Sequence, residues 1–224
     1  MKGRVARLTL LLSLGLAACA GGPPKPAWQG DAHDAQQLAM AAELDGNTRI
    51  AQAEWRRARV ALASTAQPAW VARLELSRCA VQQASLDMRP CDAFAALQAD
   101  AAVEERAYLN YLEARPTDAD VALLPAAHRA VAQALLHKDA AAGGGARLLA
   151  QVEDPLATLV AASVLLRSGL ADADVQQRAV DTASAQGWRR PLLAWLTLQA
   201  EAARQSGQTE RVQQIERRRA LLLP

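Results

Sequence analysis

The sequence predicts an all-α protein built from stacked helical hairpins, an arrangement known as an α-solenoid. Alanine supplies much of the 51% hydrophobic content, and alanine is the strongest helix former. Val, Ile and Thr never gather into alternating runs, so no segment has the pattern of a strand. Glycine, proline and short polar clusters interrupt the apolar stretches at short intervals. We therefore expect about ten to twelve helices with short connections, each packed antiparallel to the next.

The N-terminal segment has the pattern of a bacterial export signal. Three basic residues within the first seven form a charged head, and an apolar run follows at residues 8–16. This run is far shorter than the roughly 20 residues of a transmembrane helix. Small residues then precede a cysteine, and Leu16-Ala17-Ala18-Cys19 resembles the lipobox of bacterial lipoproteins. The alternative is an ordinary secretory signal that ends near a cysteine.

The lipoprotein resemblance implies that residues 1–18 are a signal peptide and that Cys19 carries fatty acyl chains on its sulfur and its new amine. The membrane is then a partner through this anchor. Ala20 is not the aspartate associated with inner-membrane retention, so the resemblance implies the periplasmic face of the outer membrane. Residues 19–33 are rich in proline and glycine and hold little to bury beyond Trp28, which predicts a flexible tether to a helical domain at 34–224.

The charge of the chain excludes one class of partner. Removal of the signal peptide changes the net charge from +2 to −1, because that segment holds three basic and no acidic residues. A mature chain without a basic surplus gives no reason to expect nucleic acid as a partner.

The first helices of the domain are marked by their caps. A helix begins near Asp34 and ends at Gly46, and Asn47 or Thr48 can cap the next one with a short polar side chain. Apolar residues then recur at spacings of four, three and four, which places them on one helix face. They are Ala51, Trp55, Ala58 and Leu62.

Two further cysteines flank the next break. Cys79 lies near the end of a helix that starts at Pro68, and Cys91 follows Pro90 in another helical segment. In an exported protein an even number of cysteines favours a disulfide, and a hairpin here brings the pair close together. Two buried thiols or a metal pair are the alternatives, although no histidine completes a familiar zinc spacing.

Capping signals continue to the C-terminus. Thr117-Asp118-Ala119-Asp120 has the spacing of a capping box, and Gly143-Gly144-Gly145 is the clearest break in the domain. Asp154-Pro155 in front of a helix and Gly169 behind it show the asymmetry of a single helix. Thr209 is expected to cap the last helix, which carries the basic run at residues 217–219.

A weak internal repeat is centred on the glycines that end helices. Around Gly46, several residues occupy positions of the tetratricopeptide signature: Leu38, Ala39, Ala42, Ala51, Trp55 and Ala58. The chain thus resembles a degenerate tetratricopeptide array, although the signature tryptophan, the repeat-ending proline and the strict period of about 34 residues are missing. A non-repeating helical domain is the alternative. Stacked hairpins bury a continuous core, because one hairpin cannot bury its apolar face alone.

No pattern of catalytic or metal-binding residues is present. His33 lies beside two aspartates, but in a flexible tether it cannot preorganise a site. His128 and His137 are nine residues apart, on opposed faces of one helix, and lack the spacing of a helical zinc site. Glu104 and Glu105 are adjacent and therefore point apart. We expect no enzyme activity, no metal and no cofactor.

The sequence offers one candidate surface for a protein partner. Stacked hairpins expose a concave groove in which aromatic and arginine side chains serve as anchors. The candidate residues are Tyr108, Tyr111, Trp188, Arg189 and Trp195. At these spacings aromatic residues also form a core, which is the commoner arrangement.

These observations lead to two functional hypotheses. The first is a non-enzymatic scaffold, anchored by lipid, that docks other envelope proteins. Resemblance to lipidated tetratricopeptide proteins implies a role in assembling outer-membrane proteins, secretion pores or pilus machinery. The alternative is an envelope enzyme, or its accessory subunit, that acts on cell wall or polysaccharide, which requires a cleft with a buried carboxylate.

Overall fold

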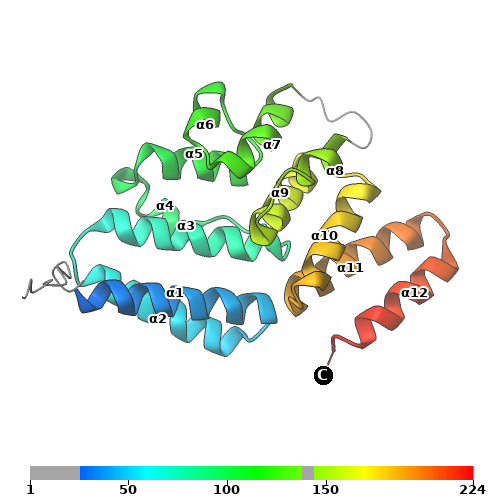
Figure 1. Ribbon diagram of the computed structural model, residues 1–224, viewed down its shortest axis with the longest axis horizontal. Helices are drawn as coiled ribbons and strands as arrows, with labels where there is room; N and C mark the ends of the chain where they lie inside the picture. The colour runs from blue at the N-terminus through cyan, green and yellow to red at the C-terminus, as the bar shows by residue number, and fades with distance from the viewer. Residues whose placement is uncertain (1–25, 138–143, 224) are drawn as a thin grey trace, which may run out of the picture.

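The computed structural model describes residues 26–137 and 144–223, and within these ranges the chain is all-helical, as predicted. It forms twelve α-helices and one short 3₁₀ helix there. Figure 1 shows consecutive helices packed side by side, with the start of α1 and the helix α12 toward opposite ends of the molecule. None of the helices in the described ranges is both long and apolar enough to cross a membrane.

The N-terminal hairpin consists of α1 (Ala27–Asp45) and α2 (Thr48–Ala63). Small buried residues at their contact let the two backbones approach closely. With Trp55, Leu62 and two residues of the following helix, Val71 and Leu74, they form one core cluster: Ala32, Ala35, Ala39, Ala42, Ala51 and Ala58. Gly46 ends α1 at φ +84°, a conformation that glycine adopts readily. Of the two residues predicted as alternative caps of α2, Asn47 is the one whose side chain caps the helix.

The start of α1 corrects the predicted tether at residues 19–33, because residues 27–33 belong to this helix. Trp28 and Ala32 pack against the core cluster of the hairpin, and this burial outweighs the low helix propensity of Gly30. Pro26 stands just before the first helical residue. Cys19, the signal peptide and the rest of the tether up to residue 25 lie outside the described residues.

The next helix, α3 (Pro68–Ala84), lies at the centre of the fold and packs against α1, α2, α5 and α9. The elements that follow it are α4 (Asp92–Ala95), the 3₁₀ helix η1 (Gln98–Asp100), α5 (Val103–Leu112) and α6 (Asp118–Leu123). The predicted capping box precedes α6. Its Thr117 backbone N–H donates to the Asp120 carboxylate at 2.8 Å.

The predicted disulfide joins Cys79 on α3 to Cys91, whose Cα atoms are 5.9 Å apart. That separation lies within the range that a disulfide spans. Cys91 is the residue just before α4, so the predicted helical segment at Pro90 and Cys91 starts only at Asp92. The bond thereby fixes the segment between α3 and α4 to the central helix.

The C-terminal part is a further set of packed helices: α7 (Ala126–His137), α8 (Gly144–Leu149), α9 (Pro155–Arg167), α10 (Ala173–Ala185), α11 (Arg189–Gln205) and α12 (Thr209–Ala220). Their buried residues join those of α3 and α5 in the main core. Thr209 is the first residue of α12, and Gln208 occupies the cap position that had been predicted for Thr209.

The glycine run at 143–145 corrects a second prediction, because Gly144 and Gly145 begin α8 and are not a break. Gly145 is buried, and a Cβ atom there would lie 2.6 Å from Cγ2 of Val175 on α10. Glycine is therefore used at this position for close packing between helices. Gly143 lies outside the described residues.

Candidate functional site

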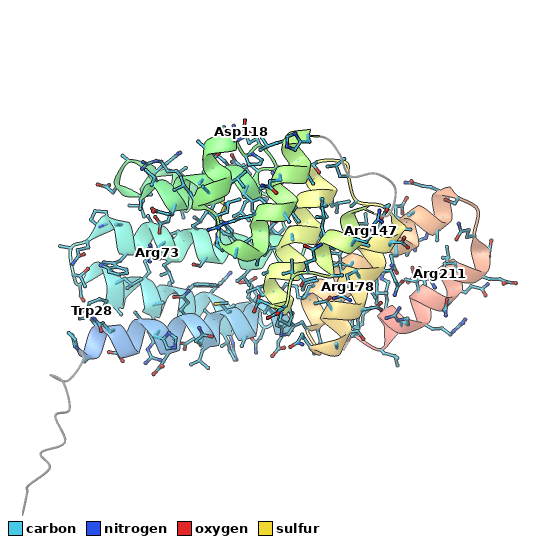
Figure 2. The ribbon with its side chains drawn as sticks, turned by 45° about the horizontal axis from the view of Figure 1, so that its top comes forward. Trp28, Arg73, Asp118, Arg147, Arg178 and Arg211 are labelled. Atoms are coloured by element: carbon cyan, nitrogen blue, oxygen red, sulfur yellow. A yellow bond between two sulfur atoms is a disulfide. The ribbon has the colours of Figure 1, made fainter. Side chains whose placement is uncertain are left out.

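A hollow of about 380 Å³ lies between the first turns of α1 and α3, and we call it the Trp28 hollow. Its aromatic side chains are Trp28 and Trp70, and the Arg73 guanidinium lies 5.8 Å from the Trp70 ring centre. Figure 2 shows Trp28 and Arg73 near the end of the molecule at which α1 begins. The remaining lining residues are Gln29, Ala32, His33, Gln36, Leu62 and Leu74.

A second hollow of about 230 Å³, the His128 hollow, lies further along α1 and α3. It shares Gln36 with the Trp28 hollow, so the two adjoin. Besides Gln36, α1 and α3 contribute Met40, Ser77, Ala80 and Val81 to its lining. The other lining residues come from α5, α7, α9 and the residue before α9: Tyr108, His128, Asp154, Leu156, Ala157 and Val160.

The third hollow, of about 340 Å³, is named the Glu105 hollow. It shares Arg73 with the Trp28 hollow, and Ser77 and Tyr108 with the His128 hollow. Its other lining residues come from α3, α5 and the end of α6: Leu76, Glu104, Glu105, Leu123, Leu124 and Pro125. The three hollows form one surface along α3, which we call the inner groove.

The inner groove is built from helices that run in the same direction. From the Trp28 hollow to the His128 hollow, the lining residues advance together on α1, from 28 to 40, and on α3, from 70 to 81. Residues 104–108 of α5 advance in the same sense beside 73–77 of α3. Figure 1 shows the same parallel course of α1, α3 and α5.

A buried histidine lies between two tyrosines at the wall of the groove. His128 is 4% exposed, with Nδ1 3.2 Å from the Tyr111 hydroxyl and Nε2 3.5 Å from the Tyr108 hydroxyl. Burial lowers the pKa of His128 to about 4, against a smaller opposing effect of the Asp154 carboxylate. Burial also raises the pKa of both tyrosines. At neutral pH the cluster is therefore uncharged.

The His128 hollow holds serine, histidine and aspartate, but these side chains do not form a catalytic triad. Both ring nitrogens of His128 face tyrosine hydroxyls, and the Ser77 hydroxyl donates to the Arg73 carbonyl at 2.9 Å. The Asp154 carboxylate accepts the Ala157 N–H at 2.6 Å, as predicted for a helix cap. A serine nucleophile needs a base within hydrogen-bond reach, and Ser77 has its bond to the backbone instead.

The buried glutamates are neutralised by arginines from neighbouring helices. Arg73 on α3 binds Glu105 on α5 at 2.6 Å, and Arg59 on α2 binds Glu75 on α3 at 2.9 Å. A third pair joins Glu43 on α1 to α11. Within residues 26–137 and 144–223, no cluster of histidine, cysteine, aspartate and glutamate is arranged to hold a metal ion.

Only one of the five predicted partner-binding residues, Tyr108, lies in the inner groove. Tyr111 and Trp195 are fully buried, so the prediction of a surface role is wrong for both, and the commoner core arrangement holds. The indole N–H of Trp195 donates to the Ala84 carbonyl at 3.1 Å. Trp188 is half-buried against the main core, and exposed Arg189 donates to the Leu222 carbonyl. The five residues therefore do not form one surface.

Several residues of the inner groove are not marked by any motif or capping pattern in the sequence. Trp28 belongs to a stretch rich in proline and glycine, and its helical position shows only through Ala32 and Gln36 at spacings of four. The pairing of Arg73 with Glu105 spans 32 residues of sequence, so no local pattern marks it. His128 has no partner in its own helix and meets two tyrosines of α5.

Comparison with known proteins gives no further guide to this site, since no protein family, curated protein or solved structure matches the chain.

Proposed function

We propose that this protein is a lipid-anchored scaffold of the bacterial envelope, which binds segments of other envelope proteins in its inner groove and does not transform them. The anchor rests on the lipobox-like sequence that ends at Cys19. The binding role rests on the inner groove, and this surface is the observation that carries the proposal.

The composition of the groove supports binding of a protein segment. Tryptophan, tyrosine and arginine are the residues that contribute most to protein interfaces, and the groove presents Trp28, Trp70, Tyr108 and Arg73 on three parallel helices. Trp70 is 40% exposed, so its ring is accessible to a partner. Apolar walls with a few polar groups are typical of binding sites.

The position of the groove relative to the anchor supports the scaffold role. Cys19 stands seven positions before Pro26, the residue directly before α1. A chain of that length spans at most about 25 Å. Lipid on Cys19 would hold the Trp28 hollow within a thin layer next to the membrane. Confinement of this kind raises the local concentration of partners in the same membrane, so modest affinities suffice.

The state of the acidic side chains favours a scaffold over the alternative of an enzyme that acts on cell wall or polysaccharide. Hydrolysis of a glycosidic bond generally needs two carboxyl groups that face each other across the cleft. In the groove, the buried carboxylate of Glu105 binds Arg73 and the Asp154 carboxylate caps α9. Glu104 lines the same hollow as Glu105, but the two are adjacent residues on one helix and do not face each other across a cleft.

Photocrosslinking from inside the groove tests the binding role. A benzoylphenylalanine at Gln36, between two hollows, should crosslink specific envelope proteins in intact cells. The matched control is the same substitution at Gln52, which is exposed on α2 and lines none of the three hollows. Equal crosslinking from both positions, or none from Gln36 together with hydrolysis of peptidoglycan by the purified protein, would overturn the proposal.

Replacement of the anchor residue tests localisation separately. Cys19→Ser removes the sulfur that the lipobox resemblance marks for acylation, so the protein should move from the membrane fraction to the soluble fraction. Mass spectrometry of the wild-type N-terminus should find acyl chains on Cys19. Unchanged sedimentation of the variant would count against the lipid anchor and would leave the groove to be judged by crosslinking.

A further inference from the structure

The Glu105 hollow contains a buried oxygen whose hydrogen-bonding capacity is unused. Glu105 is 8% exposed, and its Oε1 accepts from Arg73 at 2.6 Å. Its Oε2 is buried and has no hydrogen-bond partner among the described residues. A buried acceptor without a donor costs free energy, so this carboxylate is poised to receive one.

Among the buried glutamates of the described residues, this feature is found at Glu105 alone. Glu43 and Glu75 are also buried and paired with an arginine. Both have all their buried oxygens paired, and neither lines any of the three hollows. Within the described chain, the buried glutamate that borders a hollow is thus the one that keeps an unused acceptor.

The hollow has an excess of negative charge. The two adjacent glutamates, which the sequence led us to expect to point apart, both line it: Glu104 is exposed on the first turn of α5 and Glu105 is buried. Arg73 is its only cationic lining residue. Two carboxylates against one guanidinium leave one negative charge. Two Arg73 nitrogens, Nε and a terminal one, are already directed to Glu105, so they are not free to bind an anion.

Apart from Ser77, whose hydroxyl donates to the Arg73 carbonyl, the rest of the hollow is apolar. Its apolar walls are the ring of Tyr108 and the side chains of Leu76, Leu123, Leu124 and Pro125. A lysine or arginine side chain fits both parts, because its alkyl stem lies against apolar walls while its charged head reaches acceptors. The Tyr108 ring offers an additional cation–π contact.

We propose that the Glu105 hollow binds a lysine or arginine side chain of the partner protein, whose N–H groups donate to Glu105 Oε2 and Glu104. The terminal torsion of a glutamate is broad, so the carboxylate can turn its free oxygen toward the hollow. Its other oxygen turns with it, and the Arg73 side chain, which is 59% exposed, has room to follow that oxygen. The inference rests on the proposed function, since it names the side chain by which a partner is recognised in the groove.

Peptide binding to the full-length protein in detergent micelles tests this inference. The probes are acetyl-Ala-Ala-X-Ala-Ala-amide peptides with lysine, arginine, norleucine or glutamate at X, ranked by surface plasmon resonance. Lysine and arginine peptides should bind about tenfold more tightly than the norleucine peptide, as expected for hydrogen bonds to a charged group. Binding should weaken with added salt.

Matched substitutions locate the effect. Glu105→Gln and Glu104→Gln should each reduce the preference for lysine over norleucine. Glu75→Gln is the control for a buried glutamate paired with arginine, and Glu210→Gln is the control for an acid in the first turn of a helix. Neither control should change the preference. If Glu105→Gln loses its helical circular dichroism, Glu104→Gln and the salt dependence decide.

Other outcomes overturn the inference. Equal binding of lysine and norleucine would show an apolar site, tighter binding of glutamate would make Arg73 the anchor, and no binding of any peptide would exclude the hollow. These failures differ from a failure of the proposed function. Crosslinking from Gln36 that persists in Glu104→Gln and Glu105→Gln variants would retain the groove as a binding site and reject only its cation specificity.

Discussion

The guanidinium of Arg190 on α11 binds the buried carboxylate of Glu43 on α1 at 2.6 Å, across 147 residues of sequence. The same guanidinium donates to the Thr48 hydroxyl at the start of α2. The buried residues of the N-terminal hairpin form one core cluster with Val71 and Leu74 of α3, whereas α11 contributes to the main core. Arg190 therefore adds a polar link between the hairpin and a helix of the main core, beside the apolar link that α3 makes by contributing to both clusters.

We expect Arg190→Ala to lower the free energy of unfolding by about 1–3 kcal/mol, because it leaves a buried carboxylate without its donor. The Arg190 side chain is 30% exposed, so water replaces part of the lost interaction. Urea denaturation monitored by circular dichroism measures the change. Arg204→Ala is the control, since Arg204 pairs with exposed glutamates and should matter by less than about 1 kcal/mol. Equal effects would show that the buried partner is unimportant.

Local signals in the sequence predicted the helices well. Thr117 with Asp120, Asp154 with Pro155, and Asn47 each mark a helix start through hydrogen bonds that span only three residues. Interactions of such short range depend on neighbouring residues alone. They could therefore be predicted without knowledge of the packing, and the all-helical class follows from them.

The groove could not be predicted in the same way. Its residues come together through the packing of α1, α3 and α5, which no local pattern encodes. The spacing of Tyr108 and Tyr111 shows that they lie near each other, but only the packed structure places Tyr108 at a hollow and Tyr111 in the core. Of the five residues that the sequence suggested for one surface, Tyr108 alone lines the inner groove.

Gly145 should be intolerant of any side chain, whereas its neighbour Gly144 should accept one. A Cβ atom at Gly145 would lie 2.6 Å from Cγ2 of Val175. At Gly144, no heavy atom of the described residues lies within 4 Å of the corresponding Cβ position. We expect Gly145→Ala to destabilise the fold by about 1–3 kcal/mol through overpacking. Gly144→Ala should be neutral or slightly stabilising, because alanine favours helix more than glycine does. Thermal denaturation of the two variants compares them, and equal effects would argue against close packing of α8 on α10.

Loss of the disulfide should destabilise the protein. Cys79 and Cys91 close a loop with a sequence separation of 12, and a loop of this size gives about 3 kcal/mol in the chain-entropy account. The double variant Cys79→Ser/Cys91→Ser should therefore have a free energy of unfolding lower by about 2–3 kcal/mol. Its urea midpoint should be lower accordingly. Wild-type protein in dithiothreitol should match the variant. Identical stability of oxidised and reduced protein would show that the bond contributes nothing to folding.

His128 should make the stability of the protein depend on pH between about 6.5 and 4. Its pKa is lowered to about 4 in the folded protein, mainly by burial, and the groups that face it are Tyr108 and Tyr111 on α5 and Asp154 before α9. An unfolded histidine has a pKa near 6.5. Between these values the unfolded chain binds a proton that the folded chain does not, so stability falls as the pH falls.

The expected loss reaches about 3 kcal/mol at pH 4, from the size of the pKa difference. His128→Gln cannot bind this proton, so its stability should change much less over the same range, although it is lower at neutral pH. His33→Gln is the matched control, because His33 is exposed on α1 and should leave the wild-type pH profile unchanged. Urea denaturation at a series of pH values gives the profiles, and NMR titration of the ring protons gives the pKa of His128 directly. A folded pKa near 6.5 would contradict the burial of this imidazole between the two tyrosines.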